Sequence, residues 1–255
     1  MQAHERLTAA ITAAVDGGRT ALVPFITAGY PEPTEFIDTL KAVAAVGDVV
    51  EIGIPFSDPM ADGMTIQRSS FVALQKGVSL EWIFEQLESA GDIGAPLVMM
   101  SYLNPLLAFS YEKLAKRAAS TGVCAFIVPD LPFEECAEIR AALEAEGVGL
   151  IQLVTPATPD ERMAMLAEAS KGFVYAVTIT GITGGGAGLP EGLAEYLDRV
   201  SELSALPVCA GFGIRAAADV ANVGAHAAGA IVGSALVEVL ENGDDPAAYL
   251  QSLRP

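Results

Sequence analysis

Residues 21–55 read ALVPFITAGYPEPTEFIDTLKAVAAVGDVVEIGIP and contain the pattern that recurs through the chain. Its two ends, residues 21–27 and 49–55, are short and almost continuously apolar, which is typical of parallel strands buried on both faces. The middle has apolar residues at helical spacing, followed by Gly47, a residue type that commonly ends helices. The stretch therefore predicts a strand, a helix and a second strand. The helical positions are Phe36, Ile37, Leu40, Val43 and Ala44.

The same unit recurs along the rest of the chain. Further apolar runs bounded by Gly or Pro follow at intervals of roughly thirty residues, at residues 96–102, 125–130, 149–155, 173–180, 207–214 and 229–233. Glycines stand where the intervening helices are expected to end, at Gly91, Gly122, Gly147 and Gly172. Eight strands alternating with helices over 255 residues predict an α/β protein, a (β/α)₈ TIM barrel with a parallel eight-stranded core. We expect one domain spanning residues 1–255.

An open, doubly wound α/β sheet is the alternative architecture. It favours a G-x-G-x-x-G turn after the first strand, where a dinucleotide is bound. Residues 26–33 read ITAGYPEP at that point and lack the motif. The barrel is therefore preferred, and function is expected on the loops that follow the C-terminal ends of its strands.

Composition excludes several classes of function. The chain has 14 Lys and Arg against 32 Asp and Glu, a net charge of -18, so binding to nucleic acid or to an anionic membrane is not expected. Its two histidines, His4 and His226, cannot assemble a histidine-based metal site. Three cysteines without disulfide spacing fit a reducing cytoplasm. The longest apolar run, residues 227–237, is too short to span a membrane.

Two of the loops after strands stand out. The connection from residue 55 to about residue 80 is far longer than an ordinary βα turn, and loops of that length are often functional. Residues 181–190, GITGGGAGLP, contain five glycines that leave the backbone free to close over a ligand. Both loops are expected at the functional end of the barrel.

Glu51 is the candidate proton donor. It lies in VVEIGIP, residues 49–55, and strand alternation puts Val49, Glu51 and Gly53 on one side of the strand. On the inner side of a barrel, burial raises the pKa of a carboxyl group and lets it hold a proton near neutral pH, as a general acid requires. The alternative is a structural glutamate that is satisfied by a buried arginine or by backbone groups.

Asp62 follows the same strand, in the segment PFSDPMADGMTIQ. An Asp-Gly pair usually marks a turn, which is the ordinary interpretation of Asp62. Two carboxyl groups at one strand end, in different environments, can however divide the roles of proton donor and charge stabiliser. Asp62 is therefore the second candidate for catalysis.

Glycines after the last two strands predict a phosphate site. Gly213 and the pair Gly233–Ser234 stand where barrels of this kind commonly bind phosphate, next to a short helix N-terminus, and Gly184 precedes them. Arg215 is the nearest cation, although its position also fits the start of the next helix. No lysine lies in a predicted strand, so carbon-carbon chemistry through a Schiff base is not expected.

Residues 51–67, EIGIPFSDPMADGMTIQ, resemble the signature of the α subunit of tryptophan synthase, a strand glutamate followed by GIPFSDP and ADG. The resemblance implies a TIM barrel that cleaves indole-3-glycerol phosphate to indole and glyceraldehyde 3-phosphate by a retro-aldol reaction, late in L-tryptophan biosynthesis. It continues along the chain at VPFITAGYP (23–31), SYLNP (101–105), VPDLP (128–132), FVYAVTITGITG (173–184), GFGI (211–214) and IVGSAL (231–236).

The resemblance also implies roles for particular residues. Glu51 matches the acid that protonates C3 of the indole and then takes the proton of the substrate hydroxyl at C3′, and Asp62 matches the aspartate that binds the indole N–H. Tyr175 matches a tyrosine near the reacting side chain, although a core aromatic is an equal alternative. The implied phosphate residues are Gly184, Gly213, Gly233 and Ser234, and the implied pocket residues are Phe25, Tyr102, Ile127, Phe212 and Thr183.

A partner is implied as well. The β subunit of the family uses pyridoxal phosphate, so this chain is expected to hold no cofactor and no metal. It is expected to join the β subunit in an α₂β₂ assembly through residues 57–60 and 104–105. Two departures from the family pattern fall on loops, Met64 in place of proline and Gly185–Gly186 in place of Ala-Arg. They motivate one alternative, a weakly active chain that mainly activates its β subunit. A free-standing lyase that releases indole is a further alternative.

Overall fold

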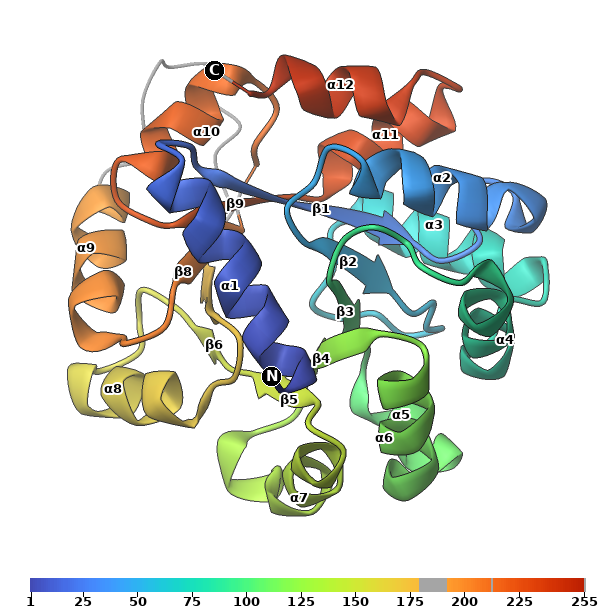
Figure 1. The fold of residues 1–255 in the computed structure, drawn as a ribbon, viewed down its shortest axis with the longest axis horizontal. Helices are drawn as coiled ribbons and strands as arrows, with labels where there is room; N and C mark the ends of the chain where they lie inside the picture. Colours follow the sequence, from blue (N-terminus) through green and yellow to red (C-terminus); the bar gives the residue numbers. More distant parts are fainter. Residues whose placement is uncertain (179–191, 212, 255) are drawn as a thin grey trace.

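The strands form a barrel that is surrounded by helices (Figure 1). The computed structural model describes residues 1–178, 192–211 and 213–254. The paired strands are parallel, and their order around the barrel is β5-β4-β3-β2-β1-β9-β8-β7-β6. The strands are β1 Ala21–Thr27, β2 Val50–Gly53, β3 Leu97–Met100, β4 Val123–Ile127, β5 Gly149–Ile151, β6 Leu153–Val154, β7 Val174–Val177, β8 Val208–Gly211 and β9 Gly229–Val232.

Helices follow most strands and pack on the outside of the barrel (Figure 1). The described α-helices are α1 Ala3–Asp16, α2 Phe36–Ala44, α3 Met64–Gln75, α4 Leu80–Ala90, α5 Leu103–Phe109, α6 Tyr111–Ser120, α7 Ala137–Ala145, α8 Asp160–Ala169, α9 Leu193–Leu203, α10 Ala217–Gly224, α11 Ser234–Glu241 and α12 Pro246–Ser252. Two 3₁₀ turns, η1 Pro33–Glu35 and η2 Phe133–Glu135, precede α2 and α7. None of these described helices is both long enough and apolar enough to cross a bilayer.

The barrel is interrupted at Gln152. The strand predicted at 149–155 forms two short strands, of which β5 pairs with β4 and β6 pairs with β7. The N–H of Gln152 donates to Ser170 Oγ at 2.9 Å, and its carbonyl accepts from the N–H of Tyr175 at 3.0 Å, so the backbone stays hydrogen-bonded through the break. All eight predicted strands are therefore present, and the ninth arises from this split.

Side chains alternate between the barrel interior and the layer under the helices. Val50 and Ile52 of β2 belong to the apolar cluster that packs against the helices, whereas Val49, just before β2, belongs to a second cluster inside the barrel. Glu51 therefore points inward, as the alternation predicts.

Helix α1 closes one end of the barrel, and the sequence did not lead us to expect it (Figure 1). Leu7, Ile11 and Ala14 are buried among the interior side chains. The hydroxyl of Thr8 donates to the carbonyl of Gly172, just before β7, at 2.7 Å. Because α1 covers the N-terminal ends of the strands, their C-terminal ends are left for the functional site.

The long connection after β2 contains a helix that the sequence did not lead us to expect. Helix α3 occupies half of the segment that we took for a loop. Its Ile66 and Val72 pack against Phe25 and Tyr30, and its Ser69 shares a buried hydrogen bond of 2.6 Å with Thr27 of β1. The helix therefore anchors the residues before it, including Asp62, to the barrel.

Four of the five glycines that we expected at helix ends have the left-handed backbone that favours glycine. They are Gly91, Gly122, Gly147 and Gly172, with φ of 68°, 78°, 73° and 90°. Gly47 corrects our interpretation, because it does not have a positive φ. A Cβ at Gly47 would lie 2.7 Å from Cγ of Pro24, so the close approach of β1 requires this glycine.

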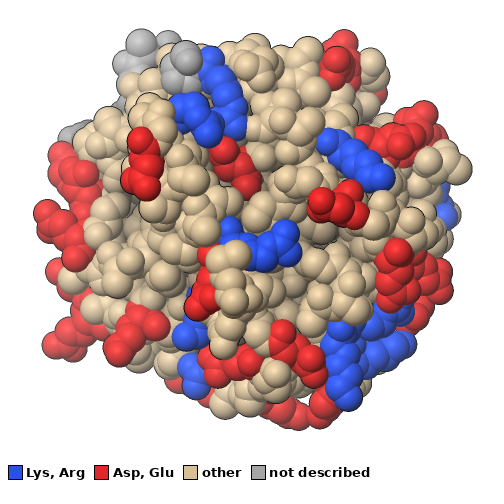
Figure 2. Space-filling model, in the orientation of Figure 1, with Lys and Arg blue, Asp and Glu red and all other residues tan. Residues whose placement is uncertain are grey.

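The acidic surplus is distributed over the surface. On the face that α1 crosses, acidic side chains are numerous around the rim, and basic side chains stand beside them singly or in small groups (Figure 2). Ion pairs elsewhere on the surface, such as Arg162–Glu134 at 2.6 Å, are exposed. Exposed pairs of this kind contribute little to stability, so the fold rests mainly on its two apolar clusters.

Candidate active site

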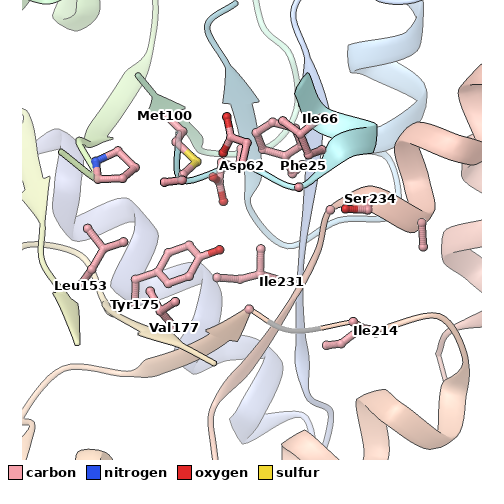
Figure 3. Close-up of a pocket in the computed structure, with 18 of the residues that line it drawn as sticks. Phe25, Asp62, Ile66, Met100, Leu153, Tyr175, Val177, Ile214, Ile231 and Ser234 are labelled. Atoms are coloured by element: carbon pink, nitrogen blue, oxygen red, sulfur yellow. The ribbon is translucent and has the colours of Figure 1, made fainter. Parts of the chain in front are cut away.

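A cavity opens at the C-terminal ends of the strands. Its volume is about 250 Å³. Figure 3 shows Asp62 and Tyr175 reaching toward it from opposite sides, with Ser234 at a third side. The described residues that line it are Phe25, Glu51, Ala61, Asp62, Gly63, Ile66, Met100, Pro129, Leu153, Tyr175, Val177, Gly211, Gly213, Ile214, Arg215, Ile231, Gly233, Ser234 and Ala235.

Glu51 on β2 lies at the inner end of this cavity with 1% of its surface exposed. Its Oε2 atom is buried without a hydrogen-bond partner among the described residues. None of the ion pairs between described residues involves Glu51, which argues against a structural pair with an arginine. Burial and, secondarily, the charge of Asp62 raise the pKa of Glu51 to about 8. Glu51 is therefore mostly protonated at neutral pH.

The neighbouring strand supplies the cover over Glu51. Phe25 of β1 pairs with Glu51 in the register of the two strands. The Phe25 ring fills the space in front of Gly53, where a Cβ would come within 2.6 Å of the ring atom Cε2. A glycine two residues after Glu51 thus makes room for an aromatic side chain beside β2.

Asp62 reaches the cavity from the segment between β2 and α3, and it is half-buried. Burial raises the pKa of Asp62 to about 6, and the nearby Tyr102 hydroxyl opposes this shift by hydrogen bonding to the carboxylate. The same hydroxyl accepts a hydrogen bond of 2.8 Å from the N–H of Ala61. Tyr102 is itself buried and stacks on Phe56, with ring centroids 5.1 Å apart. Two aromatic side chains thus hold the segment that carries Asp62.

Tyr175 enters the cavity from β7 and directs its ring between Leu153 and Ile231 (Figure 3). Burial, and then the charges of Glu51 and Asp62, raise the pKa of Tyr175 well above its ordinary value, so its hydroxyl keeps its proton. A Cβ at Gly211 of β8 would lie 2.9 Å from the phenol carbon Cζ, so this glycine makes room for the ring. Tyr175 thus lines the same cavity as Glu51 and Asp62.

The predicted phosphate residues Gly213, Gly233 and Ser234 all line one end of the cavity. Ser234 is the first residue of α11, and the N–H groups at a helix N-terminus favour anions. A Cβ at Gly213 or Gly233 would meet no atom within 4 Å, which leaves their backbone open to a ligand. Gly184, the fourth predicted residue, lies outside the described residues.

The structure distributes the predicted pocket residues unequally. Phe25 lines the cavity, whereas Tyr102 lies behind Asp62 and outside the described lining. Ile127 is buried in the interior cluster below the cavity and is not among the described lining residues either. Thr183 and Phe212 lie outside the described residues.

Several lining residues escaped the sequence analysis. They share a position at the last inward-facing residue of a strand or at the start of α3, and they are Ile66, Met100, Leu153, Val177 and Ile231. Alternation counted back from each strand end would have found the four strand residues. Ile66 required knowledge of α3.

The lysines and the possible metal-binding side chains can both be located in the described part of the chain. The five lysines lie on helices or in loops, away from the strands, at Lys41, Lys76, Lys113, Lys116 and Lys171. Among the described residues, no group of three or more His, Cys, Asp or Glu side chains is placed to hold a metal ion. The titratable side chains that line the cavity are Glu51 and Asp62, two carboxyl groups with raised pKa values, the phenol of Tyr175, and Arg215.

Comparisons with known proteins agree on one family. A sequence model described as tryptophan synthase alpha chain matches residues 11–254. A tryptophan synthase alpha chain of Roseiflexus sp. (strain RS-1) is 47% identical over 227 residues, which cover 88% of this chain and 87% of that protein. One of Nitratidesulfovibrio vulgaris (strain DP4) is 42% identical over 249 residues, which cover 97% of each.

Solved structures give the same result. Tryptophan synthase from M. tuberculosis, in an open form with BRD0059 bound, contains a chain that matches with a TM-score of 0.88 and 33% identity, over 97% of this chain and 96% of that chain. The alpha subunit of tryptophan synthase from Legionella pneumophila str. Paris matches with a TM-score of 0.88 and 32% identity, over 99% of this chain and 97% of that chain.

Proposed function

The chain belongs to the tryptophan synthase alpha chain family, and from this premise we propose how the cavity carries out the family's reaction. The chain is a lyase of tryptophan biosynthesis that cleaves indole-3-glycerol phosphate to indole and glyceraldehyde 3-phosphate. In this reaction a carbon-carbon bond breaks, a proton is added to C3 of the indole ring, and a proton leaves the C3′ hydroxyl. The protein has to supply a proton donor, a proton acceptor and a charge stabiliser.

Glu51 is the proposed proton donor. Its carboxyl group is buried and neutral at pH 7, and its Oε2 atom lacks a partner among the described residues, so the proton is available to a substrate atom. Transfer of this proton to C3 converts the ring into a cation that can accept the electron pair of the breaking bond. The carboxylate that remains then takes the proton of the C3′ hydroxyl as the aldehyde forms, which restores Glu51.

Asp62 is the proposed charge stabiliser. Its pKa of about 6 lies below that of Glu51, so at pH 7 Asp62 is mainly ionised while Glu51 is mainly protonated. A carboxylate that accepts a hydrogen bond from the indole N–H stabilises the positive charge that develops on the ring after protonation at C3. Because their environments differ, Glu51 can act as the proton donor while Asp62 acts as the charge stabiliser.

Tyr175 is proposed as a hydrogen-bond donor to the glycerol part of the substrate. Its hydroxyl keeps its proton across the neutral range and lies in the cavity with both carboxyl groups. The apolar walls formed by Phe25, Met100 and Leu153 suit the indole ring, and the end formed by Gly213, Gly233 and Ser234 suits the phosphate. This lining supports the binding of a substrate that joins an apolar ring to a phosphate.

The chain has a β-subunit partner, as a tryptophan synthase alpha chain. We infer an α₂β₂ assembly in which pyridoxal phosphate belongs to the β subunit and this chain works without a cofactor. Exposed residues near the cavity support a contact there, namely Ser57, Met60 and Asn104, and Met60 is 84% exposed. The three free, buried cysteines fit a cytoplasmic enzyme.

A chain that mainly activates its β subunit is the second candidate. This candidate is suggested by the departures from the family pattern at Met64 and at Gly185–Gly186. Gly185 and Gly186 lie outside the described residues. Met64 is 82% exposed at the start of α3 and is not among the described residues of the cavity wall. This observation favours the lyase with an intact site, either with its partner or free-standing.

One assay tests these functions. The purified chain is incubated with indole-3-glycerol phosphate, with and without a β subunit, and free indole is measured. The proposal expects indole in both cases and more of it with the partner. Full turnover without the partner would indicate a free-standing lyase, and the absence of indole in both would overturn the proposed function.

A further inference from the structure

A charged side chain stands at the phosphate end of the cavity and is not used by the mechanism above. We infer that Arg215 recognises the phosphate of the substrate, and that Glu238 holds its guanidinium beside the site until the phosphate binds. The inference rests on the proposed function, because it assigns a further group to the same substrate. It makes Arg215 a residue that determines affinity for phosphorylated ligands.

The backbone of Arg215 is fixed, whereas its side chain is accessible. Its N–H donates to Asp219 Oδ2 at 2.9 Å, and its carbonyl accepts from the Tyr249 hydroxyl at 3.2 Å. The side chain is 52% exposed. Arg215 lines the cavity together with Gly213 and Ser234. A fixed backbone with an accessible side chain allows the guanidinium to change partners without moving the loop.

The partner of Arg215 stands one helical turn from the phosphate end. Arg215 Nη1 donates to Glu238 Oε2 at 2.7 Å, and Nη2 donates to Oε1 at 3.1 Å. Glu238 follows Ser234 by four residues on α11, and side chains at that spacing lie on one face with Cβ atoms about 6 Å apart. A rotation of the arginine side chain therefore brings its guanidinium from Glu238 to a phosphate bound at Ser234.

The exchange of partners is energetically feasible. Glu238 and Arg215 are both partly exposed, and exposed ion pairs contribute little because water already solvates both charges. A phosphate accepts the same two-pronged hydrogen bonds as a carboxylate and carries more charge. In a chain with a net charge of -18, a local cation also offsets the repulsion that a phosphate meets.

The same helix offers a matched pair for comparison. Arg68 of α3 donates from Nε to Glu241 Oε1 at 2.8 Å, and its side chain is 48% exposed. Arg68 and Glu241 thus resemble Arg215 and Glu238 in chemistry and exposure, but they are not among the described residues that line the cavity. Any effect that depends on the charge of α11 alone will appear in both pairs.

The test uses the variants Arg215→Gln and Glu238→Gln, with Arg68→Gln and Glu241→Gln as matched controls. Calorimetry measures the Kd of glycerol 3-phosphate, and indole release measures kcat and KM. Loss of one charge-assisted contact predicts about tenfold weaker binding and a KM about tenfold higher for Arg215→Gln, with kcat nearly unchanged. Glu238→Gln removes the competitor and predicts binding about threefold tighter. Both controls should stay close to the unmodified protein.

The opposite changes in Kd expected for Arg215→Gln and Glu238→Gln distinguish this inference from a structural role of the ion pair. A merely structural ion pair predicts weaker binding in both Arg215→Gln and Glu238→Gln, and either that result or an unchanged Kd in Arg215→Gln would overturn the inference. If Arg215→Gln lowers the unfolding temperature, Arg215→Lys keeps the charge and should recover part of the affinity. Absence of indole release by the unmodified chain would overturn the proposed function instead, whatever the variants do.

Discussion

Glu51 and Asp62 face the same cavity, and the charge of Asp62 helps to keep the proton on Glu51. Glu51 belongs to strand β2, inside the barrel, whereas Asp62 belongs to the segment that leads into α3. The carboxyl group of Glu51 is almost completely buried, whereas that of Asp62 is half-buried. The pKa of Glu51 is therefore about 8 and that of Asp62 about 6. Two carboxyl groups with different protonation states at pH 7 follow directly from these two positions.

This relationship predicts a bell-shaped pH profile. Activity requires Asp62 to be ionised and Glu51 to be protonated, so kcat/KM should rise as pH increases through about 6 and fall as pH increases through about 8. Initial rates of indole release from pH 5 to 9.5 measure the profile. A rate that stays constant from pH 7 to 9.5 would contradict the role of a protonated Glu51.

Replacement of the proton donor should abolish most of the activity. Glu51→Gln keeps the shape of the side chain and cannot donate an acidic proton, so kcat is expected to fall about 100- to 10,000-fold. Glu51→Asp keeps the acid but shortens the side chain, and should retain more activity than the glutamine variant. Equal activity of Glu51→Gln and the unmodified chain, measured as indole release, would exclude Glu51 from catalysis.

The same substitution should make the protein more stable, and increasingly so as pH rises. The pKa of Glu51 is about 8 in the folded protein and 4.5 in its ordinary state, so between these values the folded protein holds a proton that the unfolded chain releases. The stability of the unmodified protein relative to Glu51→Gln should therefore fall by up to about 1.4 kcal/mol per pH unit across that window. Urea unfolding of both proteins at pH 5, 6.5 and 8 tests this, and a difference independent of pH would refute it.

Tyr102 should act on the reaction through Asp62. Tyr102→Phe removes the hydroxyl that accepts from Ala61 and lowers the pKa of Asp62, so the acidic limb of the pH profile should move to higher pH. The lost hydrogen bond should also reduce the free energy of unfolding by about 1 kcal/mol. Tyr111→Phe, on α6, serves as the control because Tyr111 does not line the cavity. An acidic limb that stays in place would show that Tyr102 only packs.

The strands and the inward position of Glu51 could be predicted because they follow from local patterns. Continuous apolar runs and a period of two are properties of neighbouring residues, so the positions of the strands and the alternation of their side chains could be predicted without coordinates. The phosphate end was accessible for the same reason, since its glycines directly follow strands. Helix α3 could not be predicted in this way, because its hydrophobic face is short and packs against Phe25 and Tyr30, which belong to a distant strand and turn.

The remaining features depend on contacts between residues far apart in the sequence. The break at Gln152 is stabilised by Ser170 and Tyr175, and Arg215 finds its partner 23 residues away on α11. Tyr102 was expected in the pocket wall, but its hydroxyl is directed to Ala61 and Asp62. Gly53 and Gly211 lie in predicted strands, but the strand pattern does not indicate that each makes room for an aromatic ring of the adjacent strand.

The protonation state of Glu51 can be measured directly. In protein labelled with ¹³C at the glutamate side-chain carboxyl carbon, the Glu51 signal is identified by its absence in Glu51→Gln and followed by NMR as pH is raised. We expect a titration midpoint near 8, which Asp62→Asn moves to lower pH. A midpoint near 4.5, the ordinary value for a glutamate, would mean that this carboxyl group is ionised at neutral pH and cannot donate the proton that starts the cleavage.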